Sequence, residues 1–218
     1  MSDGDFSDER IRAGFLDAAV AEELPGLALR WAPVERGSGR SNRALRERLA
    51  ILSDRFAGAQ AIELRQRPIP WAYRVFYRHI GLDPDEQPTP VEALALERLQ
   101  KGGFLSNNLL DDALTIAIME SGVALQAFDA DSVQAPLGIR PSRAGEALDG
   151  RPGDLPLGTL VIADANEPVS LLFGAIGSGR GVDRRTERML VASIQVSGVP
   201  DIAVEEALWL LLEALESG

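Results

Sequence analysis

Few side chains in this sequence can act as nucleophiles, proton carriers or metal ligands. The 218 residues include no cysteine and a single histidine, His79. Serine–histidine–aspartate catalysis, cysteine catalysis and tetrahedral zinc binding all need residues that the chain largely lacks. His79 comes at the end of a helix-like segment, where a histidine usually contacts the last carbonyl groups of the helix. We therefore expect no metal and no cofactor.

A glycine-rich stretch, Gly174 to Gly181, is a second candidate for chemistry. It does not match the phosphate-binding pattern GxxxxGK[ST], and no lysine follows it, so a nucleoside triphosphate site is not predicted. The stretch is either a hairpin turn or a loop whose glycines let a ligand approach the backbone. Arginines at positions 180, 184, 185 and 188 accompany it and are suited to holding phosphate groups.

Four segments of the chain resemble one known family. They are Asn107 to Asp129, Leu137 to Glu146, Gly158 to Asp164 and Phe173 to Leu190. In their order and spacing they resemble the B3/B4 domain, the tRNA-editing domain of the phenylalanyl-tRNA synthetase beta subunit, over residues 65 to 198. The resemblance implies an α+β fold of three layers, with mixed β-sheets and flanking helices. It also implies an editing activity, since in the synthetase this domain hydrolyses mischarged tyrosine from the tRNA.

Three polar positions of the resembled pocket differ in this chain. Gln126 stands where the family has a histidine, Ala192 where it has a glutamate that reads the tyrosine hydroxyl, and Leu114 where it has a threonine. A buried tyrosine hydroxyl without a partner costs about 1 to 3 kcal/mol. We therefore expect the pocket to prefer an aliphatic or unhydroxylated side chain to tyrosine.

The resemblance also implies roles for individual residues. Hydrolysis of an activated ester mainly requires oriented water and fixed dipoles for the oxyanion, which amides and hydroxyls can supply. Asp112 either orients one of these groups or caps the local backbone, and Arg140 either pairs with Asp129 or Asp131 or binds a carboxylate or phosphate. The predicted catalytic residues are Asn108, Asp112 and Gln126, and the predicted substrate-binding residues are Asn107, Leu114, Thr115, Arg140, Gly174, Gly177, Ser178, Gly179 and Ala192.

Charge is distributed unevenly along the chain. The net charge is −11, which argues against indiscriminate nucleic-acid binding and against DNA as a partner. Residues 30 to 67 nevertheless contain nine arginines and four acidic residues, a local charge of +5. This segment either contacts a tRNA backbone or is a solvated helix face that pairs with the acidic remainder. The predicted tRNA-binding residues are Arg43, Arg46, Arg180, Arg184 and Arg185.

Hydrophobic spacing and turn signals predict the helices and strands that carry these residues. Apolar residues recur mainly at helical spacing in the first half of the chain and mainly alternate with polar residues in the second half. This division indicates an α+β fold. Helices are predicted to include Ile11, Phe15 and Ala18, to begin at Arg43, to cover 71–80, to run from Thr89 to Gly102, to run from about Asn107 to Gly122, and to begin at Asp201. Strands are predicted at 27–31, 124–128, 137–140, 159–163, 169–173 and 189–196.

The chain is predicted to have three parts. Residues 1–64 form an extension packed on the core, 65–200 the B3/B4-like domain, and 201–218 a final helix of the same domain. The acidic start has no apolar region typical of a signal peptide, and no apolar run is long enough to cross a membrane. We therefore expect a cytoplasmic protein that does not enter a membrane.

These observations favour a freestanding deacylase that hydrolyses mischarged aminoacyl-tRNA in trans, with the aminoacylated 3′ end of tRNA as its partner. One alternative is a non-catalytic module that binds tRNA or an amino-acid-like small molecule. Another is an interaction protein that keeps only the scaffold. The oligomeric state is not predicted.

Overall fold

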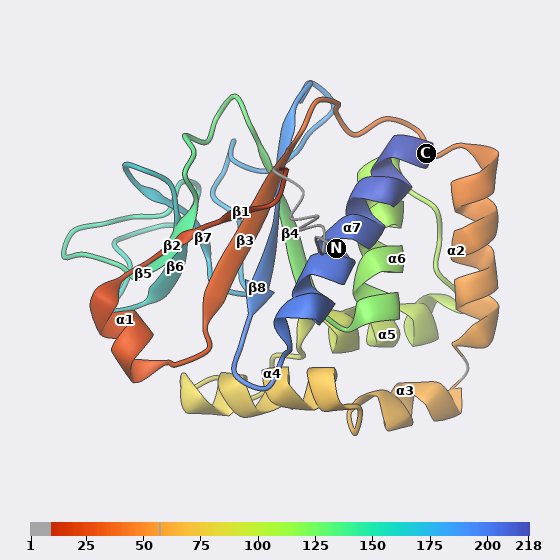
Figure 1. The fold of residues 1–218 in the computed structure, drawn as a ribbon, viewed down its shortest axis with the longest axis horizontal. Coiled ribbons are helices and arrows are strands. Elements are labelled where there is room, and N and C mark those ends of the chain that lie inside the picture. Colours follow the sequence, from red (N-terminus) through yellow and green to blue (C-terminus); the bar gives the residue numbers. More distant parts are fainter. Residues whose placement is uncertain (1–9, 57) are drawn as a thin grey trace, which may run out of the picture.

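The computed structural model describes residues 10–56 and 58–218, and the polar start predicted for the chain lies largely outside them. Helices and two separate sheets confirm the α+β class (Figure 1). The helices are α1 Ala18–Glu23, α2 Arg43–Arg55, α3 Gly58–Leu64, α4 Pro68–His79, α5 Pro90–Lys101, α6 Leu109–Ser121 and α7 Asp201–Ser217. The strands are β1 Arg12–Ala13, β2 Phe15–Leu16, β3 Ala28–Val34, β4 Ala124–Asp129, β5 Gly138–Pro141, β6 Leu160–Ala163, β7 Pro168–Leu171 and β8 Met189–Gln195.

The two sheets differ in strand direction. The first has the order β1-β3-β8-β4, and all of its pairs are antiparallel. The second has the order β2-β5-β6-β7 and is mixed, because β2 pairs with β5 in parallel. Mixed pairing, predicted for the sheets, is therefore found in only one of them. The inner strand β3 comes from the first 64 residues, so this part of the chain is built into the sheet.

Helices cover the first sheet on the side away from the second sheet. Helix α7 contacts β3 and β8, and α6 contacts α7 and β4. In Figure 1 the second sheet, the first sheet and these helices follow one another as layers, with α2 outermost. The main core fills the space between them, because β3, β4 and β8 of the first sheet bury most of their residues; β8 is buried along its whole length.

Several predicted helix ends are confirmed by their caps. Asn42 caps α2 by accepting the Leu45 N–H at 2.9 Å. Thr89 and Glu92 form a capping box at the start of α5. Gly122 ends α6 with φ 77°, a conformation that glycine adopts without a steric penalty. These caps fix where α2 and α5 begin and where α6 gives way to β4, the strand of Gln126.

Two predicted helices begin at other residues in the structure. The helical spacing of Ile11, Phe15 and Ala18 is misleading, because 12–13 and 15–16 are strands and the helix starts only at Ala18. The Gly14 N–H donates to Leu29 and the Phe15 N–H to Leu137, so pairing with two sheets overrides the local preference. The helix predicted to cover 71–80, α4, begins earlier, at Pro68, whereas α2 begins at Arg43 as predicted.

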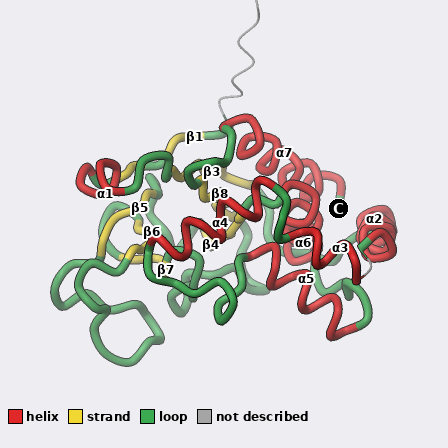
Figure 2. Tube along the Cα trace, turned by 90° about the horizontal axis from the view of Figure 1, so that it is seen from below, coloured by secondary structure: helices red, strands yellow, loops and turns green. Residues whose placement is uncertain are grey.

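Helix α4 crosses the lower side of the molecule, as the view from below shows (Figure 2). Tyr73 fixes it there, since its hydroxyl donates to the Ile194 carbonyl and accepts the Ala124 N–H at 3.1 Å. Burial raises the pKa of Tyr73 well above its ordinary value, so the hydroxyl stays protonated. Tyr73 thereby holds the middle of α4 against β4 and β8.

Candidate functional site

One cavity gathers four of the predicted site residues. It has a volume of about 620 Å³ and lies between α5, the loop 105–107 and α6. Asn107, Asp112, Leu114 and Thr115 line it, together with apolar Leu94 and Ile118 among others. Its volume lies in the range that small-molecule sites use. We call it the α5–α6 cavity; α5 also contacts β4, the strand of Gln126.

Two of the predicted catalytic residues hold the start of α6. Asn108 caps the helix by accepting the Asp111 N–H at 2.9 Å, and it accepts the Ser38 hydroxyl at 2.7 Å. Asp112 is only 1 % exposed. Its carboxylate accepts the Ser106 hydroxyl at 2.6 Å, the Asn107 N–H at 2.9 Å and the Ser41 hydroxyl. Asp112 therefore joins two loops to α6, which fits the backbone-capping alternative.

Gln126 lies at the junction of the two sheets. It is half-buried on β4, its Oε1 accepts the Ser170 hydroxyl of β7 at 3.4 Å, and it stands opposite Ala192 on β8. Its amide nitrogen has no hydrogen-bond partner among the described residues and is free to donate. Ala192 is fully buried. The sequence did not single out Ser170, because no motif links it to Gln126.

The glycine-rich stretch is largely occupied with its own backbone bonds. The Gly177 N–H donates to Val169 and the Ser178 N–H to Asp149, both at 2.8 Å. Gly174 lies at the edge of a different cavity from the one lined by Leu114 and Thr115. The structure thus separates Gly174 from the α5–α6 cavity, and it pairs the backbone N–H groups of Gly177 and Ser178, two of the predicted substrate-binding residues.

Arg140 has a partner that the sequence did not suggest. Its guanidinium makes two 2.7 Å bonds to the Glu146 carboxylate. These bonds, opposed by burial, hold the pKa of Glu146 below its usual range. The predicted partners Asp129 and Asp131 are wrong, because Asp129 accepts the Thr186 hydroxyl and Asp131 pairs with Arg188. The turn after β5 returns Glu146 to Arg140, a contact that spacing alone does not reveal.

The predicted tRNA-binding arginines divide into paired and free groups. Arg180 is surrounded by Asp149, Glu167 and Asp164. Burial raises the pKa of the Asp164 carboxyl, but hydrogen bonds from three backbone N–H groups and the charge of Arg180 outweigh this effect. The pKa of Asp164 therefore lies below its ordinary value. Arg43 pairs with Glu47 at 2.7 Å, and the Arg46 Nε donates to the Asn42 carbonyl at 3.2 Å. Arg184 and Arg185 are exposed and have no side-chain partner in the described ranges.

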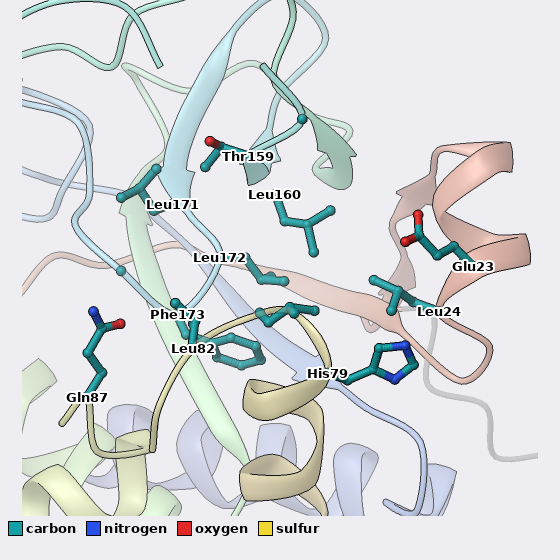
Figure 3. A pocket seen from close by; sticks show the side chains of 13 residues that line it. Glu23, Leu24, His79, Leu82, Gln87, Thr159, Leu160, Leu171, Leu172 and Phe173 are labelled. Atoms are coloured by element: carbon teal, nitrogen blue, oxygen red, sulfur yellow. The ribbon is translucent and has the colours of Figure 1, made fainter. Parts of the chain in front are cut away.

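A second cavity, of about 480 Å³, lies between the ends of α1 and α4 and the hairpin of β6 and β7 (Figure 3). We call it the hairpin cavity. Its wall combines leucine, isoleucine and phenylalanine side chains with the polar groups of Glu23, His79, Gln87 and Thr159. The expected contact of His79 with helix carbonyls is absent from the described residues, because its ring turns to this cavity instead. The two cavities share no lining residue.

Phe173 lines the hairpin cavity, and its backbone has an unusual conformation. Its φ is 58°, a region that bulky residues rarely adopt. Its ring lies 5.0 Å from Tyr77, 5.8 Å from Tyr73 and 6.0 Å from Phe76, measured between ring centroids. Packing against three rings of α4 stabilises the strained residue, so this wall of the cavity is rigid.

Within residues 10–56 and 58–218 no group of three or more acidic or histidine side chains is arranged to hold a metal ion. In the same ranges none of the helices has both the length and the apolar character that crossing a bilayer requires.

Comparison with known proteins identifies the family of this α+β protein. The B3/4 domain model matches residues 72–200, more than half of the chain. The chain therefore belongs to the B3/4 domain family. It is also similar to phenylalanine–tRNA ligase beta subunits: 41% identical over 108 residues to that of Xanthomonas euvesicatoria pv. vesicatoria and 41% identical over 100 residues to that of Xylella fastidiosa. These matches cover 48% and 44% of this chain but only 13% and 12% of the relatives.

Proposed function

We propose that this chain is a deacylase that acts in trans on aminoacyl-tRNA and hydrolyses the ester between a mischarged amino acid and the tRNA 3′ end. One observation carries the proposal: all residues that line the α5–α6 cavity lie inside the 72–200 match to the B3/4 family. The similarity of the chain to phenylalanine–tRNA ligase beta subunits, whose name includes tRNA, supports tRNA as the partner. The cytoplasm is the location that fits this substrate.

The cavity offers suitable groups for an aminoacyl ester. Leu94, Leu114 and Ile118 supply an apolar wall for the side chain, while Asn107 and Thr115 supply polar groups. Water adds to the ester carbonyl, the bond to the ribose oxygen breaks, and the amino acid leaves as a carboxylate. Gln126 does not itself line the α5–α6 cavity, but its strand β4 contacts α5, and we assign the orientation of this water to its free amide nitrogen. Asn108 and Asp112 serve by holding Asn107 and the start of α6 in place.

The apolar wall predicts a substrate preference. Leucyl-tRNA should be hydrolysed at least about fivefold faster than tyrosyl-tRNA, since a tyrosine hydroxyl buried against Leu114 has no partner. The measurement is the initial rate of deacylation across a panel of mischarged tRNAs at one ionic strength. A clear preference for tyrosyl-tRNA would show that the amino-acid side chain of the substrate does not bind against Leu114.

A non-catalytic binding module is the second candidate. The observation that favours it is that Asn108, Asp112, Gly177 and Ser178 all use their polar groups within the fold. The same panel separates the two functions. Binding of tRNA without turnover of any member would favour the module.

Arg184 and Arg185 should carry a large share of the tRNA affinity, because they are the predicted tRNA-binding residues whose side chains have no partner in the described ranges. Changing both to glutamine should lower the slope of log affinity against log salt by about 2 units, about 1 for each phosphate that is no longer neutralised. Filter binding between low and moderate salt measures the slope. Arg151→Gln, at another exposed arginine, is the control and should leave it unchanged. An unaltered slope in the double variant would assign both arginines to solvent.

A further inference from the structure

The hairpin cavity has a chemical character of its own. It is formed by three segments that are distant in the sequence: the end of α1, the end of α4 with its following loop, and the residues around β6 and β7. Glu23 and Leu24 lie outside the 72–200 family match, so the first of these walls is added by the extension. The cavity is therefore specific to how this chain is built rather than to the matched segment alone.

Charge determines which ligands the cavity can accept. Glu23 is the one carboxylate among its lining residues, and neither arginine nor lysine lines it in the described part of the chain. A ligand with a carboxylate or phosphate would face Glu23 with neither an arginine nor a lysine to pair with it. Glu23 itself has no ion-pair or hydrogen-bond partner within the described ranges. Figure 3 shows Glu23 and His79 at one end of the cavity, with Leu160 and Leu172 beyond them.

The position of Glu23 adds to its negative potential. It is the last residue of α1, whose final turn contains no basic residue, so a carboxylate stands at the negative end of the helix. This placement is locally unfavourable for the helix and favourable for a bound cation. Together with the rigid wall at Phe173, it makes a preformed site with a negative end and an apolar body.

We propose that the hairpin cavity binds a small primary amine that has an aliphatic or aromatic body and no carboxylate. The ammonium group pairs with Glu23, and the body contacts Leu160, Leu172 and Phe173. Free amino acids are disfavoured because no arginine or lysine lines the cavity in the described ranges to pair with their carboxylate. The site shares no residue with the α5–α6 cavity, and its ligand does not depend on the deacylase function.

Three probes of nearly equal shape test the proposal: 3-methylbutylamine, the uncharged 3-methylbutan-1-ol, and leucine. His79 is the only histidine, so in the untagged full chain its imidazole gives a single set of NMR signals that reports on this cavity. The amine should shift these signals and bind about two- to fivefold more tightly than either the alcohol or leucine, as expected for one ion pair with the exposed Glu23 carboxylate.

Two glutamine variants complete the test. Glu23→Gln should remove the preference for the amine over the alcohol, and it should not unfold the chain because it relieves a charge at the end of α1. Glu22→Gln changes the neighbouring exposed carboxylate, which does not line the cavity, and should keep the preference. Equal affinity for amine and alcohol, or an unchanged preference in Glu23→Gln, would overturn the proposal whether or not the chain hydrolyses aminoacyl-tRNA.

Discussion

Gln126→Ala is expected to lower the rate of aminoacyl-tRNA hydrolysis about 100-fold, because removal of one positioned polar group at a reacting centre typically has an effect of this size. The side chain is half-buried, and its amide nitrogen has no partner in the described residues, so the fold does not rely on its donor. Folding and tRNA affinity should therefore change little. Single-turnover deacylation with a preferred substrate measures the effect.

Two further variants make the role of Gln126 specific. Gln126→His introduces a group that titrates near pH 6.5. The plot of hydrolysis rate against pH should therefore show an inflection near pH 6.5 in this variant that is absent from the parent protein. Ser170→Ala removes the hydroxyl that donates to Gln126 and should have a smaller effect, since only the orientation of the amide is loosened. If Gln126→Ala hydrolyses every accepted substrate at the parent rate, the residue is part of the scaffold.

Asp112→Ala should destabilise the protein by about 4 kcal/mol. The carboxylate is buried and accepts bonds from two serine hydroxyls and one backbone N–H, all of which would lose their partner. Bonds to a charged group contribute about 1.5 to 3 kcal/mol each, and their effects are not additive. Urea unfolding followed by circular dichroism measures the change in the free energy of unfolding.

The neighbouring aspartate is a matched control for this variant. Asp111 is exposed in the same helical turn, and Asp111→Ala should cost about 1 kcal/mol or less. A stable Asp112→Ala protein that has lost only its turnover would contradict the structural role and return Asp112 to the reaction. A destabilised protein whose folded fraction keeps the parent rate would support the role of an anchor.

Local signals were enough to place most of the elements that carry the site. The caps at Asn42, Thr89 and Gly122 depend on residues within one turn of each other, so the sequence alone predicts them. The change from helical spacing to alternation after Gly122 likewise predicts the α+β class, and four ordered segments point to the B3/4 family. The same reasoning fails at 12–16, where pairing with two distant strands outweighs local spacing.

The sequence alone determines three features: the family, the order of the main elements, and the apolar character of Leu114 and Ala192. All three depend on residue type and short-range spacing. Which polar groups remain free depends instead on the folded chain. Asp112 meets Ser41, Arg140 meets Glu146, and Glu23 shares a cavity with His79, each through the packing of separate segments. Such contacts depend on how sheets and helices dock, which hydrophobic burial sets over the whole chain, so no local pattern encodes them.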